Sequence, residues 1–282
     1  MAGRSVLITG ASTGIGEACA RHLAAREWQV FAGVRKVDDG ERLRASSPRI
    51  EPLTLDVTSA SDLTAAVELV RERTGGTLDG LVNNAGVAVG GPIEYVTADE
   101  WRHQFEVNVI GPVELTRACL PLLRAARPAG RVVMIGSIGG RMASPLLGPY
   151  SASKHAMEAI AETLRHELRG DGIKVALIEP GAIRTPMWEK GRQTADELEH
   201  RLPPEALDRY RKTIDGVRKS IDMQERNAVP PEKVAAAVER ALGSNHPHAR
   251  TLVGPDAKVM GAATRVLPDS ARDALLRLAS RT

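Results

Sequence analysis

The chain has 282 residues, of which 43% are hydrophobic and 26% are charged, which is ordinary for a soluble globular protein. Its 38 basic and 35 acidic residues are interleaved along the sequence, and aromatic residues make up only 3%. This composition argues against a nucleic-acid partner, because nucleic-acid-binding surfaces use clustered cations or aromatic stacking platforms.

The N-terminus and the two cysteines exclude further classes of protein. The sequence enters a predicted strand without a charged leader, and no run of about 18 apolar residues follows. Cys19 and Cys119 lie far apart in predicted helices, with no Cys or His at ligand spacing beside them. We therefore expect a cytoplasmic protein with no membrane span, no disulfide framework and no metal site.

Short apolar runs rich in β-branched residues alternate with longer segments of helical periodicity. The predicted strands cover 5–9, 29–34, 50–55, 78–84, 130–137, 173–180 and 249–254. The predicted helices lie near 14–26, 59–74, 98–126, 149–169 and 231–243. This alternation predicts an α/β fold of the Rossmann type, with a doubly wound parallel sheet and helices on both of its faces. There are no internal repeats, so we expect one domain over residues 1–282.

Residues 182–230 interrupt this alternation, because they connect a predicted strand to a helix with far more chain than such connections need. The segment is charged and contains helical pieces. A peripheral surface excursion would account for it. Its position after the carboxyl end of a strand favours a substrate-binding lid, since ligands of open α/β sheets bind at that edge.

The first predicted strand runs into a glycine-rich turn, "TGASTGIG", and then into a helix. Glycines permit a tight turn and a close approach of the backbone to a phosphate, and the helix N-terminus presents free N–H groups to it. An ordinary glycine turn is the alternative, but the strand before and the helix after favour a dinucleotide. The residues predicted to contact this cofactor are Gly10, Ser12, Thr13, Gly14, Ile15 and Gly16.

The ends of the second and third strands are predicted to meet the adenosine of the cofactor. Arg35 and Lys36 follow the second strand, and no acid appears until Asp38. A guanidinium suits the 2′-phosphate of NADP, whereas NAD is usually met by an acid, so we expect NADP over NAD unless Arg35 is only a solvated surface charge. Asp56 is placed to accept a hydrogen bond from the adenine or to bind the start of the next helix, and Val57 beside it is also predicted to contact the cofactor.

Polar side chains follow the fourth strand and interrupt the next helix. Asn84, Ala85 and Gly86 are predicted to border the cofactor, although the amide could instead bind neighbouring backbone. Asn108 lies among apolar residues inside the predicted helix 98–126, where an amide is a poor helix former with polar atoms to satisfy. A structural hydrogen bond and a catalytic relay are both open for Asn108.

A serine, a tyrosine and a lysine are spaced as a catalytic set. Ser137 ends the fifth strand, and Tyr150 precedes Lys154 by four positions, which places both on one side of a helix. A free tyrosine has a pKa of about 10, and we expect the ammonium and the positive nicotinamide ring to lower it towards neutrality. Ser137 would bind the substrate oxygen. Each residue alone could be structural, but the combination favours catalysis.

These segments resemble the short-chain dehydrogenase/reductase family over about residues 4–255, through "TGASTGIG", "NNAG", Asn108, Ser137 and the "YSASK" run from Tyr150 to Lys154. The resemblance implies a seven-stranded parallel sheet. It also implies that Tyr150 is the acid or base, that Lys154 binds the cofactor ribose and lowers the tyrosine pKa, that Ser137 orients the substrate, and that Asn108 supports a water relay.

The segment "EPGAIRT" is similar to the one that this family places against the nicotinamide. The residues implied there are Pro180, Gly181, Ile183 and Thr185. More narrowly, "FAGVR", the segment around the "YSASK" run and the late "LPDSARDALL" resemble the branch with hydroxysteroid, retinol and 3-hydroxybutyrate dehydrogenases. Gly136, where many members have a second serine, and Arg35, in a branch that contains NAD users, depart from that pattern.

The predicted function is therefore an NAD(P)-dependent oxidoreductase that transfers hydride between nicotinamide and a secondary alcohol or ketone. The residues expected to line the substrate pocket are Met142, Leu146, Met187 and Trp188. Such a pocket suits a steroid-, retinoid- or lipid-like substrate. Charged residues beyond Trp188 keep small hydroxy acids open as an alternative.

Two further expectations concern the class of protein and its assembly. A non-catalytic protein that senses NAD(P) could use the same fold, but the set of Ser137, Tyr150 and Lys154 argues against it. The family pairs the helices 98–126 and 149–169 across a two-fold axis, which implies a homodimer or homotetramer.

Overall fold

The computed structural model describes residues 3–274 and contains a seven-stranded sheet in the order β3-β2-β1-β4-β5-β6-β7. Every neighbouring pair of strands is parallel. The strands are β1 (Ser5–Ile8), β2 (Gln29–Val34), β3 (Ile50–Thr54), β4 (Gly80–Asn83), β5 (Arg131–Ile135), β6 (Lys174–Pro180) and β7 (Arg250–Val253). The expected seven-stranded Rossmann-type sheet is confirmed.

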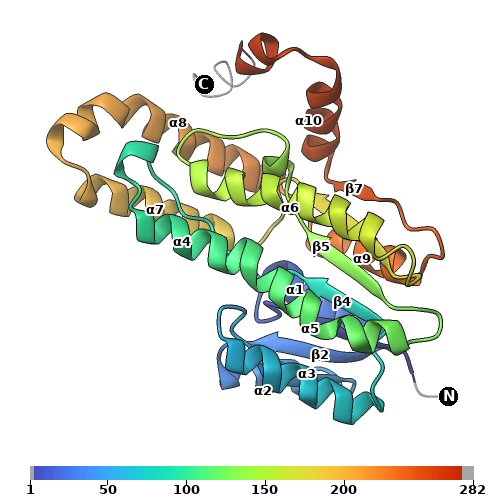
Figure 1. The fold of residues 1–282 in the computed structure, drawn as a ribbon. Helices are drawn as coiled ribbons and strands as arrows, with labels where there is room; N and C mark the ends of the chain where they lie inside the picture. The colour runs from blue at the N-terminus through green and yellow to red at the C-terminus, as the bar shows by residue number, and fades with distance from the viewer. Residues whose placement is uncertain (1–2, 275–282) are drawn as a thin grey trace.

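Helices cover both faces of this sheet (Figure 1). They are α1 (Gly14–Ala24), α2 (Val37–Arg44), α3 (Ala60–Thr74), α4 (Ala98–Phe105), α5 (Gly111–Ala125), α6 (Gly148–Glu167), α7 (Met187–Arg201), α8 (Pro204–Asn227), α9 (Glu232–Gly243) and α10 (Pro255–Val266). Two short 3₁₀ helices, η1 (Ile93–Tyr95) and η3 (Ile138–Gly140), and one π-helical turn, η2 (Glu106–Ile110), lie between them.

The strands are apolar on both sides because each side packs against helices. In β1, Val6 and Ile8 belong to a buried cluster with α1 and α9, whereas Leu7 belongs to a second cluster with α3, α5 and α6. Successive side chains of a strand point to opposite faces, so an unbroken apolar run fits a doubly covered sheet. The strand order reverses between β1 and β4, and this switch point places the carboxyl ends of the central strands at a ligand-binding edge.

The helix expected over 98–126 runs without a break through α4, η2 and α5, and η2 is one π turn within it. Asn108 lies within η2 and is buried. Its amide binds backbone and side-chain groups outside the helix, and π turns often occur where a side chain has such a role. The sequence also did not predict α2, which is short and mostly polar, or α10.

Residues 182–230 form an excursion that contains α7 and α8, and Figure 1 shows these helices projecting beyond the strands at one side of the sheet. Its two ends are joined by backbone hydrogen bonds, from Arg184 N to Val229 O (2.9 Å) and from Val229 N to Ala182 O (3.0 Å). We call this segment the α7–α8 excursion. Its apolar interior is a small cluster of Leu198, Leu202, Ala206 and Ile214.

Candidate active site

The turn between β1 and α1 is shaped for close approach of a ligand to the backbone. Gly10 and Gly14 have φ values of +64° and +60°, which disfavour residues with a side chain. A Cβ at Gly16 would lie 2.2 Å from the carbonyl oxygen of Gly10. Thr13 does not cap α1 with its side chain, so the first N–H groups of the helix are available to an anion.

The segment after β4 holds this turn in place. The Asn84 side chain donates hydrogen bonds to the carbonyl oxygens of Thr9 (2.9 Å) and Gly10 (3.1 Å), and the Thr9 hydroxyl accepts from the N–H groups of Asn84 and Ala85. The backbone role that the sequence left open for Asn84 is therefore present. Contacts of Asn84, Ala85 and Gly86 with a cofactor stay a prediction.

Charged groups lie where the adenosine end of a dinucleotide is expected. Arg35 and Lys36 follow β2 and are exposed. Hydrogen bonds from the Thr58 N–H and hydroxyl lower the pKa of Asp56, and the charge of Arg35 adds to this effect, so Asp56 is ionised near neutral pH. Asp56 thus binds the backbone at the start of the next helix, which was one of the two roles expected for it. Val57 beside it is buried.

Arg42 reaches the same region and was not singled out in the sequence. One nitrogen of its guanidinium donates to the carbonyl oxygen of Ser12 (2.5 Å), and another lies 2.6 Å from a Glu17 carboxylate oxygen. Arg42 comes from α2, whose position the sequence pattern did not predict. No sequence signal therefore connected this arginine to the glycine turn.

Ser137 and Tyr150 face each other at the carboxyl end of β5. The Ser137 hydroxyl accepts a hydrogen bond from Gly139 N (3.0 Å). A Cβ at Gly139 would lie 3.3 Å from both Ser137 Oγ and a Tyr150 ring carbon. Burial raises the pKa of Tyr150, and its hydrogen bond with Ser137 acts in the opposite direction. Among the protein groups desolvation therefore outweighs the neighbouring hydrogen bond, and the lowering expected from the ammonium together with the nicotinamide ring stays a prediction.

Lys154 is buried next to this pair, with only 7% of its surface exposed. Its ammonium donates a hydrogen bond to the carbonyl oxygen of Ile135 (2.8 Å) and lies 5.8 Å from the centre of the Tyr150 ring. Burial lowers the pKa of Lys154 to about 8. The structure thus brings Ser137, Tyr150 and Lys154 together, as their spacing predicted.

Asn108 fastens the segment after β4 to α6. Its amide nitrogen donates to Val87 O (3.0 Å) and Ser153 Oγ (3.1 Å), and its amide oxygen accepts from Val87 N (2.9 Å). The Ser153 hydroxyl in turn donates to the carbonyl oxygen of Tyr150 (2.7 Å). This is a structural role for Asn108, and the catalytic relay stays a prediction.

Gln104, one helical turn before Asn108, acts on the same loop and was missed in the sequence. Its side chain accepts from Val89 N (2.7 Å) and donates to Val87 O (2.9 Å), and it is fully buried. The signal that could have found it is its spacing, since a second buried amide lies four residues from Asn108 on one face of the helix.

The segment after β6 is held by α10. Asp256 accepts a hydrogen bond from Ala182 N (2.6 Å), and a Cβ at Gly181 would lie 2.2 Å from a carboxylate oxygen of Asp256. Glycine is therefore required at position 181 for the backbone to pass this carboxylate. The family-like "EPGAIRT" segment owes its path to this contact.

The same segment reaches the glycine turn. A Cβ at Gly14 would lie 3.1 Å from the methyl carbon of Thr185, so these two predicted cofactor residues are neighbours. Pro180 and Ile183 are buried, and Ile183 pairs with Val229 at the base of the α7–α8 excursion. The residues predicted for the two ends of a nicotinamide cofactor thus line one edge of the sheet.

The four residues expected to line the substrate pocket differ in their surroundings. Leu146 packs against the apolar cluster of the α7–α8 excursion, and the Trp188 indole donates to Ile183 O (2.7 Å). Met142 is half-buried, while Met187 is 46% exposed. The apolar pocket itself stays a prediction.

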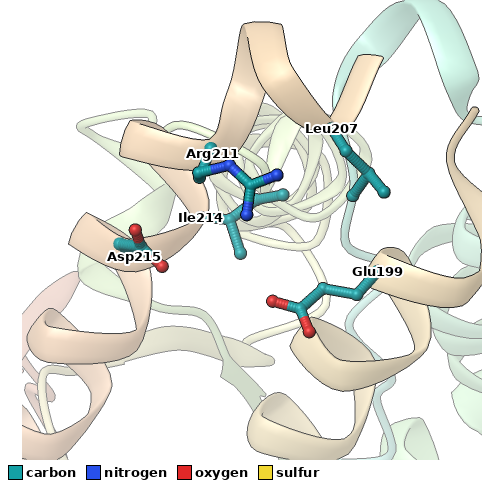
Figure 2. A pocket seen from close by; sticks show the side chains of 5 residues that line it. All are labelled: Glu199, Leu207, Arg211, Ile214 and Asp215. Atoms are coloured by element: carbon teal, nitrogen blue, oxygen red, sulfur yellow. The ribbon is translucent and has the colours of Figure 1, made fainter. Parts of the chain in front are cut away.

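A cavity of about 160 Å³ lies inside the α7–α8 excursion, and Figure 2 shows the side chains that line it. It is lined by Glu199 from α7 and by Leu207, Arg211, Ile214 and Asp215 from α8. None of these residues is part of the catalytic group or of the predicted substrate pocket. The cavity is therefore a gap between two helices of the excursion, separate from the catalytic edge.

Residues 3–274 contain no group of three or more His, Cys, Asp or Glu side chains arranged to hold a metal ion. Within the same range, none of the helices combines the length and the apolar character needed to cross a membrane. Of the branch-like segment "LPDSARDALL", the last two residues, 275 and 276, lie outside the described range.

Comparison with known proteins gives similarity over nearly the whole chain. The family described as short chain dehydrogenase matches residues 4–196. An NADPH-dependent 3-dehydrocapnine reductase of Ornithobacterium rhinotracheale is 38% identical, covering 96% of this chain and 95% of the relative. Human retinol dehydrogenase 16 is 37% identical, covering 96% and 87%. The crystal structure of a short-chain dehydrogenase from Streptomyces avermitilis has a TM-score of 0.80 and 32% identity, covering 98% and 96%.

Proposed function

Because this chain belongs to the short-chain dehydrogenase/reductase family of oxidoreductases, we propose that it is an NADP-preferring enzyme that interconverts a ketone and a secondary alcohol on a hydrophobic substrate. The observation that carries the proposal is the meeting of Ser137, Tyr150 and Lys154 at the sheet edge that also holds the glycine turn. In the direction of reduction, the bound cofactor supplies the hydride that adds to the carbonyl carbon.

Three residues of the protein would bind the oxygen of that carbonyl and protonate it. The Ser137 hydroxyl donates a hydrogen bond to it and fixes its position. The Tyr150 hydroxyl transfers a proton to the same oxygen as negative charge develops there, and Lys154 stabilises the phenolate that remains. The reverse sequence applies to oxidation of the alcohol, in which Tyr150 accepts the proton.

The site fits a phosphorylated dinucleotide. The glycine turn leaves no room for side chains, and the uncapped start of α1 offers N–H groups to a pyrophosphate. Arg35 and Lys36 put two exposed cations near the expected 2′-phosphate, and Arg42, which is paired with Glu17 and Asp39, lies at the adjoining glycine turn. The NADPH dependence named for the Ornithobacterium relative supports the same preference.

The substrate is proposed to be lipid-like and to bind beneath the α7–α8 excursion, which would act as a lid. Leu146 and Trp188 connect the catalytic edge to that excursion, and Met187 is exposed at its start. The relatives support an apolar substrate, since one of them is named for retinol. The word reductase in the name of the other relative favours carbonyl reduction.

An activity screen tests this proposal. The protein is mixed with NADPH or NADH and with long-chain ketones, steroids, retinoids and short keto acids, and nicotinamide absorbance is followed. We expect faster oxidation of NADPH than of NADH with the apolar ketones. Turnover restricted to short acids would contradict the apolar pocket, and tight NADPH binding without turnover would favour a sensing protein.

We also propose that the protein is a homodimer or homotetramer through the faces of α5 and α6. Ile110, just before α5, is 44% exposed, and the outer face of α6 carries small residues such as Ala159. Small side chains let two helices approach closely across a two-fold axis. Light scattering at micromolar concentration should give at least twice the monomer mass, and a monomer would contradict this assembly.

A further inference from the structure

A buried arginine–glutamate pair joins the segment after Ser137 to the end of β6 and has no role in the chemistry described above. Arg141 follows η3, and its guanidinium binds both carboxylate oxygens of Glu179 near the end of β6, with a distance of 2.6 Å between Nη2 and Oε2. Glu179 is fully buried, and the Arg141 side chain is 14% exposed. We call this contact the Arg141–Glu179 pair.

The pair joins segments that carry the catalytic and cofactor residues. Arg141 lies four positions after Ser137, and Glu179 directly precedes the Pro180–Gly181 turn. The intervening η3 rests on α6, because a Cβ at Gly140 would lie 2.8 Å from the carbonyl oxygen of Lys154. Movement of Arg141 would therefore displace both the serine and the helix that carries Tyr150.

A second arginine completes the network on the side of α6. Arg250 of β7 lies 2.7 Å from carboxylate oxygens of both Glu158 and Glu162. Burial raises the pKa of Glu179 to about 7; Arg141 acts against this shift, and the nearby Glu158 carboxyl adds to it. The network thus keeps two carboxyl groups close together inside the protein, which is costly unless each is held by a cation.

Stability alone is a weak reason for such an arrangement. A buried ion pair is often no more stabilising than apolar residues of similar size, although removal of one partner is strongly destabilising. What the arrangement supplies is geometry, because a guanidinium that binds a carboxylate through two parallel hydrogen bonds fixes both distance and orientation.

We propose that Arg141 and Glu179 are positioning residues, which lock η3 against the end of β6 and so hold the Ser137 hydroxyl at its working distance from Tyr150. This inference rests on the proposed function for the meaning of that distance. A displacement of about 1 Å in a reacting group can cost about a hundredfold in rate, so a lock of this kind has a measurable effect.

The test separates positioning from stability. In the single variants Arg141→Met and Glu179→Gln, an unpaired buried group remains, and we expect a lower midpoint of thermal unfolding. In the double variant Arg141→Met/Glu179→Met, both polar groups are replaced by apolar side chains of similar size, and the midpoint should return close to the wild-type value. Its kcat should nevertheless stay about tenfold or more below wild type, with the Kd for NADPH within about twofold.

A matched control uses an exposed pair of the same chemistry. Arg124 and Asp171 are joined at 2.8 Å on the surface, and the variant Arg124→Met/Asp171→Asn should keep wild-type kcat. A conservative variant, Arg141→Lys, keeps the charge and one hydrogen bond, and it should recover part of the kcat that Arg141→Met loses. A double variant with restored unfolding midpoint and wild-type kcat would overturn the proposal.

Amide hydrogen exchange gives a readout that does not need turnover. In the double variant, peptides covering residues 137–147 should exchange several-fold faster than in wild type, while peptides of α3 should be unchanged. Unchanged exchange over 137–147 would overturn the positioning role. If wild type itself reduces no ketone, the proposed function fails, and the exchange result still decides whether the pair holds this loop.

Discussion

The body of the fold and the α7–α8 excursion are held together by different interactions. In the body, residues of the catalytic edge lie between two large apolar clusters, and Lys154 and Asn108 are buried with hydrogen bonds of 2.8 to 3.1 Å. The excursion has one small apolar cluster and many surface ion pairs, such as Arg218 with Glu199 (2.6 Å) and Arg192 with Glu225 (2.5 Å).

This difference suggests that the body carries the catalytic residues and that the excursion determines which substrate binds. An exposed ion pair contributes about 0 to 1 kcal/mol, whereas burying one large apolar side chain contributes about 1.5 to 3 kcal/mol. The excursion can therefore open or change sequence at little cost to the body. Segments of low local stability are the ones that move around ligands, so the proposed lid is where we expect specificity to reside.

The largest expected effect is on catalysis at the rigid edge. In Tyr150→Phe only the hydroxyl that moves the proton is lost, so kcat should fall by about 10² to 10⁴-fold while the Kd for NADPH changes little. Steady-state kinetics and fluorescence titration with NADPH measure the two quantities. A variant with near-normal kcat would mean that another group transfers the proton.

The next effect is on the stability of the body. Leu81 of β4 is fully buried in the cluster with α3 and α5, so Leu81→Ala should lower the free energy of unfolding by about 2 to 5 kcal/mol. Unfolding in urea, followed by circular dichroism, measures this change. A loss below about 1 kcal/mol would show that the cluster adjusts more easily than close packing implies.

Cofactor preference should respond by a smaller factor. Arg35→Asp removes a cation from the expected 2′-phosphate and places an acid near a ribose hydroxyl. A charge-assisted hydrogen bond is worth about 1.5 to 3 kcal/mol, so the ratio of kcat/KM for NADPH to that for NADH should fall by about tenfold to a hundredfold. Arg44→Asp on the exposed face of α2 serves as the control. An unchanged ratio would remove Arg35 from the cofactor site.

The smallest effect on stability is expected in the excursion. Arg218 joins α8 to Glu199 and Asp196 of α7 at a partly exposed position, so Arg218→Met should change the free energy of unfolding by less than about 1 kcal/mol. Its KM for the ketone should change more than its kcat, because the lid is loosened and the catalytic edge is not. If Arg218→Met lowered the free energy of unfolding as much as Leu81→Ala does, the two regions would not differ in the way described.

Features that depend on neighbours along the chain were predictable from the sequence. The strand–glycine turn–helix unit around Gly14 needs only local spacing, and Tyr150 and Lys154 share a helix face because they are four residues apart. The alternation of apolar runs was enough for the parallel sheet. A single sequence displays these patterns because the interacting residues are close together along the chain.

Features that depend on contacts between distant segments were not predictable. Arg42 reaches the glycine turn from a helix that the pattern missed, and Arg141 meets Glu179 only once β6 lies beside β5. The π turn at Asn108 depends on backbone groups of Val87, far away in the sequence. The direction of the Tyr150 pKa in the chain alone follows from burial, which a sequence does not display.

The most direct test of the proposed chemistry follows the hydride itself. The wild-type protein is incubated with NADPH that carries deuterium at nicotinamide C4, in each of the two stereoisomers, together with a long-chain ketone, and the alcohol is analysed by mass spectrometry. We predict one deuterium on the carbinol carbon from one stereoisomer only, and almost none with Tyr150→Phe in the same time. An alcohol without deuterium from either stereoisomer, or no alcohol although NADPH binds, would contradict the account.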